Sequence, residues 1–103
     1  MVKSSRPKRE NLLQDIRKAI ESGCYFDTSH AVQRGSERSV TKMEYEYVLK
    51  TGWHEKAKDQ YDVQNKAWNY AIRGKTVDTR ELRVVVSFDE EGLLIITVID
   101  LEV

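Results

Sequence analysis

The spacing of apolar residues changes near Gly52, from a helical period to a period of two. Before this point Leu12, Ile16 and Ile20 recur at helical spacing. In the last third of the chain every second residue is apolar over Leu82, Val84, Val86 and Phe88. A helix buries one stripe of side chains, whereas a half-buried strand buries alternate ones. The chain is therefore predicted to be an α+β domain, with helices in its first half and an antiparallel sheet in its second.

Two or three helices are predicted before Gly52. The first is expected to start at Pro7 and to stop at Ser22-Gly23, because glycine takes the left-handed cap without steric cost. The second is expected to start near Ser29, since residues 27–29 are all favourable N-cap types, and to run to about Arg38.

The third helix has the clearest local signal in the chain. Thr41 and Glu44 stand at the spacing of a capping box, in which each side chain bonds the backbone N–H of the other. Val40 and Tyr45 flank this pair at the positions of a hydrophobic staple. A helix is therefore predicted from Thr41 to Gly52.

The strands are predicted from alternation and from one turn. Residues Trp68–Ile72 alternate, and Asp89–Gly92 is a hairpin turn that precedes the apolar run Leu93–Leu101. That run is apolar on both faces, as expected of a central strand covered on both sides. A weaker strand is expected over Trp53–Lys58, and residues 24–26 are expected to form a short extended link. The sheet is thus predicted to be a three- to four-stranded antiparallel meander.

Length and composition predict one domain without cofactors. The 103 residues suit a single domain over residues 9–103, after a flexible polar lead over residues 1–8. Cys24 is the only cysteine, so neither an intrachain disulfide nor a multi-cysteine zinc site can form. The longest apolar run, Leu93–Ile99, is far too short to span a membrane, and no signal peptide is recognised. A cytoplasmic protein is expected.

The charges are balanced overall but unevenly placed. Residues 1–42 contain nine basic and five acidic residues, whereas residues 77–103 contain two basic and seven acidic residues. A basic front of this kind permits the binding of an anion on one face. The net charge of zero argues against a protein that coats duplex DNA, which would be distinctly basic.

The main candidate site is a His/Arg stripe on the second predicted helix. His30, Arg34 and Arg38 are spaced four residues apart and so fall on one helix face. An imidazole can move a proton, and two guanidinium groups can hold phosphate oxygens in bidentate fashion. In the first helical turn, the positive end of the helix dipole disfavours the imidazolium form of His30. The pattern is therefore suited to phosphoryl transfer, with all three residues catalytic.

The same stripe also has a purely structural interpretation. Arginines on an exposed helix face commonly form ion pairs, here with Glu37 or Glu44 as available partners. A histidine that follows three capping residues can simply bond the local backbone. Both interpretations stay open on the sequence alone.

Other candidates are weaker. His54-Glu55 matches half of a zinc-protease helix motif, but the second histidine is missing, and no metal site is predicted. Tyr70 belongs to a set of strand aromatics that could stack bases but are more often core residues. Arg73-Gly74 begins a segment that lacks the spacing of a phosphate loop and is interpreted as a turn.

The order of several short motifs resembles the domain-of-unknown-function family DUF4258. These motifs are T-S-H-A-V-Q-R-G-S-E-R-S-V-T over residues 28–41, Y-V-L-K-T-G over 47–52, W-N-Y-A-I-R-G over 68–74, L-R-V-V-V-S-F over 82–88 and I-I-T-V over 95–98. The resemblance runs from about Leu12 to Leu101, and its most specific element is H-A-x-x-R-x-x-x-R.

The resemblance implies a bacterial protein with the helix-then-sheet layout of RelE- and BrnT-type small ribonuclease toxins. It adds weight to His30, Arg34 and Arg38, and secondarily to Thr97 in the last strand. We therefore expect a metal-independent ribonuclease of the toxin–antitoxin type, with Thr97, Tyr70 and Arg73 as substrate-binding residues. RNA and a cognate antitoxin are the expected partners. The alternative is a non-catalytic protein-binding domain, and the sequence does not indicate an oligomeric state.

Overall fold

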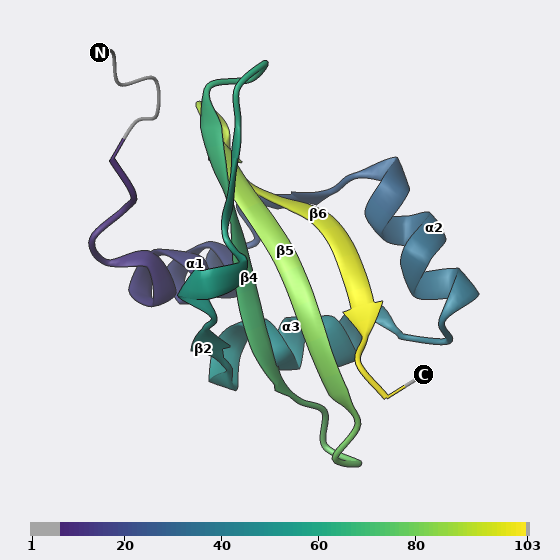
Figure 1. Ribbon diagram of the computed structural model, residues 1–103. Helices are drawn as coiled ribbons and strands as arrows, with labels where there is room; N and C mark the ends of the chain where they lie inside the picture. The colour runs from purple at the N-terminus through teal and green to yellow at the C-terminus, as the bar shows by residue number, and fades with distance from the viewer. Residues whose placement is uncertain (1–6, 103) are drawn as a thin grey trace.

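Three long antiparallel strands form the centre of the protein (Figure 1). The computed structural model describes residues 7–102, apart from the side chain of His30. Strand β4 (Ala67–Lys75) pairs with β5 (Glu81–Asp89), which pairs with β6 (Gly92–Asp100). Ile72, Val84 and Val98 lie opposite one another across these strands and are fully buried. The alternation in the sequence thus marks the inner face of the sheet.

Three shorter strands enlarge the sheet at both edges. Strand β1 (Tyr25–Asp27) runs parallel to β6, and β2 (Trp53–His54) and β3 (Gln60–Asp62) both pair with β4. A 3₁₀ turn, η1 (Lys56–Lys58), separates β2 from β3. The described part of the sheet therefore has six strands, in a mixed arrangement. The predicted meander of three or four strands was too small, because strands of two or three residues show no alternation.

Three helices accompany the sheet: α1 (Leu12–Ser22), α2 (Ser29–Glu37) and α3 (Lys42–Thr51). Helices α1 and α3 cover its inner face, and α2 lies beside β6 (Figure 1). Helix α1 ends at Gly23 in the left-handed conformation (φ 77°), and Thr41 and Glu44 form the predicted capping box. The predicted third helix is confirmed.

The first helix begins later than Pro7 predicted. Residues 7–9 are not helical: Lys8 Nζ contacts Asp59 Oδ2 at 2.9 Å, and the Arg9 N–H donates to the Tyr70 hydroxyl at 2.9 Å. Before α1 starts, these two contacts join the chain to the residue that precedes β3 and to β4. Residues 1–6, most of the predicted flexible lead, lie outside the described residues.

A β-bulge in β6 explains why its apolar residues occupy both faces. Val85 pairs with Thr97 and Val86 pairs with Ile95, so Ile96 is an extra residue that shifts the alternation. Leu93 and Ile95 are fully buried before the bulge, as is Val98 after it. The face of the sheet opposite α1 and α3 is its outer face. No helix of residues 7–102 covers it, and the β6 residues on it are half-buried (Figure 1). The expectation that this strand would be covered on both sides was therefore wrong.

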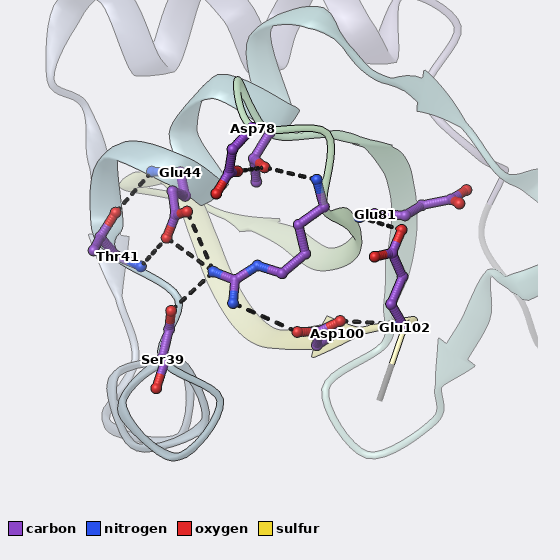
Figure 2. A network of polar contacts seen from close by, with 9 residues as sticks. Ser39, Thr41, Glu44, Asp78, Glu81, Asp100 and Glu102 are labelled. Carbon is purple, nitrogen blue, oxygen red and sulfur yellow. Dashed lines mark hydrogen bonds and ion pairs between the residues drawn. The ribbon is translucent and has the colours of Figure 1, made fainter.

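A polar network around Arg80 joins four parts of the fold, and Figure 2 shows its partners Ser39, Glu44 and Asp100. The Arg80 guanidinium donates to the Ser39 carbonyl at 2.8 Å and to Glu44 at 3.1 Å, and it lies 3.7 Å from Asp100. Its backbone N–H donates to Thr76 Oγ1 at 3.0 Å. The side chain thus connects the α2–α3 junction, α3, the β4–β5 turn and the end of β6.

Within residues 7–102, no helix has the length and apolar character needed to cross a bilayer.

Candidate functional site

The start of α2 is fixed by Thr28, which also ties the helix to β6. Its backbone is extended, and its Oγ1 accepts a hydrogen bond from the Ala31 N–H at 3.1 Å. The same hydroxyl donates to the Ile96 carbonyl at 3.2 Å, and the Thr28 N–H donates to the Ile95 carbonyl at 3.1 Å. Of the three capping residues predicted from the sequence, Thr28 is the one that begins α2, and it also places the helix against the bulged strand.

The three positions of the predicted catalytic set lie along one side of this helix, which we call the α2 flank (residues 30, 34 and 38). His30 is the second residue of the helix, and its side chain is outside what the structure describes. Arg34 and Arg38 are half-buried, whereas Val32 is 57% exposed. Ala31 is fully buried in the core. The two arginines therefore lie between the buried side of α2 and its exposed side, each partly open to solvent.

The arginines of the α2 flank have structural partners as well. Arg34 Nη1 lies 3.2 Å from Glu37 Oε1, an ion pair between residues three apart on the helix. The Arg38 N–H donates to the Arg34 carbonyl at the helix end. Glu44, the other acidic partner considered, binds Thr41 and Arg80 instead. The structural interpretation of the stripe is thus correct for one of its two predicted ion pairs, and it leaves a catalytic role open.

The predicted substrate-binding residues do not converge on one surface. Thr97 is half-buried on β6, the strand against which α2 packs, and lies opposite Val85. Tyr70 is 3% exposed in the core, and Arg73 lies three residues along β4 on the opposite face. Of the three, only Thr97 lies on the strand beside the α2 flank.

In a comparison with protein-family models, residues 28–100 match a domain of unknown function (DUF4258). The chain belongs to this family. The match begins at Thr28, the cap of α2, and not near Leu12 as the motifs suggested, so α1 lies outside it. Neither the curated proteins nor the solved structures contain a match to the chain.

The DUF4258 region also contains a histidine–carboxylate pair that the sequence did not reveal. His54 Nε2 lies 2.7 Å from Asp59 Oδ2, and the Asp59 side chain is only 1% exposed. Lys8 Nζ and the Ala71 N–H bind the same carboxylate. The sequence signal for this pair is a histidine and an aspartate on either side of a short turn. Residues at this spacing are not brought together within a single helix or strand. The partner of His54 is thus a carboxylate and not a second histidine.

On the outer face of the same region, Glu55 is held by two arginines. Glu55 Oε1 accepts from Arg83 Nε at 2.8 Å, and Oε2 accepts from Arg73 Nη1 at 3.1 Å. The hydrogen bond from Arg83, followed by that from Arg73, lowers the pKa of Glu55 below its ordinary value. Glu81 binds Arg73 as well, at 2.6 Å. Arg73 is therefore already neutralised by protein carboxylates.

Among the residues whose side chains are described, no group of three or more His, Cys, Asp or Glu side chains is placed so that it could hold a metal ion.

Proposed function

We propose that this domain is a metal-independent ribonuclease of the toxin–antitoxin type, with its site on the α2 flank. The observation that supports this proposal best is the start of α2. Thr28 caps the helix, so the backbone of His30 lies in its first turn and Arg34 and Arg38 follow one and two turns later. The family match also includes all three positions.

In this proposal His30 accepts the proton of a ribose 2′-hydroxyl. The 2′-oxygen attacks the adjacent phosphorus, the bond to the 5′-oxygen breaks, and the proton passes to that leaving oxygen. The products are a 2′,3′-cyclic phosphate and a free 5′-hydroxyl. A position in the first turn of a helix disfavours the charged imidazolium, which keeps His30 able to act as a base.

Arg34 and Arg38 hold the phosphate and neutralise the charge that develops on it. For this, Arg34 exchanges its partner Glu37 for a phosphate oxygen. Both side chains of that pair are substantially exposed, at 41% and 47%, and such surface pairs contribute at most about 1 kcal/mol. The exchange is therefore easily offset by a doubly hydrogen-bonded phosphate. RNA is the proposed substrate, and a cognate antitoxin is the proposed protein partner.

The test is incubation of the purified protein with mixed RNA, with and without a chelator. We expect chelator-resistant cleavage that leaves cyclic phosphate ends. Substituting His30→Ala should lower the cleavage rate by about 10²- to 10⁴-fold, the usual contribution of a general base. Gln33→Ala, an exposed neighbour on the same helix, is the matched control and should leave the rate unchanged.

Three results would contradict the proposal. They are RNA that stays intact with protein shown to be folded, cleavage that persists in His30→Ala, and cleavage that requires a divalent ion. The first result would favour the non-catalytic protein-binding function.

A further inference from the structure

The sheet opens into a fork at the end where β4 begins and β5 ends. The pairing of β4 with β5 stops at Tyr70 opposite Val86, although β4 starts at Ala67 and β5 continues to Asp89. Beyond this point the Ser87 hydroxyl donates to the Trp68 carbonyl at 2.8 Å, so a side chain replaces the backbone ladder. On their other sides, β4 pairs with β3 and β5 pairs with β6. The two hairpins therefore diverge.

A groove of about 820 Å³ lies in this fork, and we call it the fork groove. Residues of both hairpins line it, and its volume is within the range of natural ligand sites. Leu94 and Ile96 provide an apolar floor, and both are half-buried. Phe26, which pairs with Leu94 across the parallel ladder, is 50% exposed and extends this apolar surface. The fork groove thus offers apolar contacts that are incompletely used within the domain.

The rim of the fork groove is acidic. Its lining includes four carboxylates, of Asp62, Asp89, Glu90 and Glu91, and two basic residues. One of these two, Arg9, is already paired with Asp15 at 3.1 Å. Hydrogen bonds from Asn65 lower the pKa of Asp62, which keeps its carboxylate ionised. The groove therefore attracts cations and repels phosphate.

This combination selects one class of ligand. An acidic rim excludes RNA and DNA, whose affinity for proteins comes largely from contacts between basic residues and phosphate. Diverging strands suit an extended peptide, because strand edges bind main-chain groups while pockets hold alternate side chains. We propose that the fork groove binds a short, extended, basic segment of a partner protein, with apolar side chains on the floor and Lys or Arg side chains at the rim.

The proposal is independent of ribonuclease activity. The lining of the fork groove includes neither Arg34 nor Arg38, and it lies at the N-terminal end of β6, at the opposite end of that strand from the Arg80 network. Loss of RNA cleavage and loss of peptide binding can therefore be measured separately on the same protein.

The test uses fluorescence anisotropy of a short labelled peptide in which Lys and Leu alternate. We expect this peptide to bind, its affinity to fall as salt is added, and the same peptide with Glu in place of Lys not to bind. Reversing the rim charges with Glu90→Lys and Glu91→Lys should weaken binding by about tenfold or more. Both residues are exposed on a turn, so these variants should keep the melting temperature of the parent. Glu21→Lys, exposed on α1, is the control and should bind as the parent does.

Several outcomes would overturn the assignment. Equal binding of the basic and acidic peptides would remove the role of charge, and equal weakening by Glu21→Lys would remove the role of the groove. Displacement of the peptide by a single-stranded RNA would assign the groove to nucleic acid. Self-association of the parent protein that is lost in Glu90→Lys would assign it to a second copy of the chain.

Discussion

At the scale of single residues, Glu55 is a carboxylate held by two arginines on the outer face. Arg73 and Arg83 lie directly opposite each other on β4 and β5, where like charges destabilise a sheet. Glu55 is only 9% exposed and donor groups of both arginines reach it. Its negative charge therefore offsets the repulsion between the two arginines, which strand pairing places side by side.

We expect Glu55→Gln to destabilise the domain by about 1–3 kcal/mol, because two half-buried guanidinium groups lose their charged acceptor. Chemical denaturation measures this change. Glu10→Gln, an exposed change of the same kind, is the matched control and should have no measurable effect. A loss as small as that of the control would show that water replaces Glu55.

The parent protein and Glu55→Gln should also differ in their stability to acid. The pKa of Glu55 is lowered in the folded state from an ordinary value of 4.5. The stabilising contribution of Glu55 is therefore complete above that pH, and it decreases as the pH falls from there through the lower folded-state pKa. In thermal melts from pH 6 to pH 3, the melting temperatures of the parent and Glu55→Gln should therefore converge as the pH falls. Parallel curves would contradict this role.

Individual residues differ in how far the sequence could place them. Thr41 and Glu44 could be paired because a capping box depends on residues three apart in one chain segment. Glu55 contacts residues 18 and 28 positions away, and its neighbour His54 contacts Asp59 across a turn. These contacts depend on strand register, which no local pattern specifies. The α2 flank was predictable for the opposite reason, since residues 30 and 34 lie in α2 and Arg38 directly follows its last residue.

At the scale of elements, the crossing of α3 over β4 depends on two glycines in contact. A Cβ on Gly52, where α3 ends, would lie 2.5 Å from the Arg73 carbonyl oxygen and 2.6 Å from that of Val48. A Cβ on Gly74 would lie 3.0 Å from the Gly52 Cα. The helix end therefore approaches the strand as closely as backbone atoms allow.

Gly52→Ala should accordingly destabilise the domain by about 1–3 kcal/mol through overpacking against fixed backbone atoms. Gly74→Ala should cost less, because its nearest contacts are longer and include the Val48 side chain at 3.3 Å. Denaturant titrations of both variants give the ranking. The reverse order would mean that α3 shifts away from β4 to accommodate the new methyl group.

Long helices and strands were predicted from the sequence more completely than short ones. The nine-residue strands and the capped helices have enough residues for a period to emerge. Strand β1 has three residues and β2 has two, and both depend on partners far along the chain. The bulge at Ile96 is reflected in the sequence by apolar residues on both faces of the strand. A strand buried on both sides has the same pattern, so the sequence could not distinguish the two.

At the scale of the whole molecule, Arg80 holds together parts that are otherwise distant. We expect Arg80→Met to destabilise the protein by about 1–3 kcal/mol, since Asp100, with a side chain 4% exposed, loses its charged partner. Hydrogen exchange should increase in α2 and at the start of α3, where Ser39 and Glu44 are released.

A double-mutant cycle provides the control for this effect. Asp100→Asn combined with Arg80→Met should cost less than the sum of the two single changes, because each removes the same interaction. Additive losses would indicate that Arg80 stabilises the fold without its ion pair to Asp100, through its bonds to Ser39 and Glu44 or through packing.

The bond between Thr28 and the Ile96 carbonyl joins residues 68 positions apart. A ribosome therefore releases β1 and α2 long before the strand that anchors them exists. The β4–β5 and β5–β6 pairings join residues that are close in the sequence, whereas β1 and α2 must wait for β6. Folding that depends on such distant pairing is slow compared with that of a helical bundle. We infer that the segments synthesised first are among the last to reach their native positions.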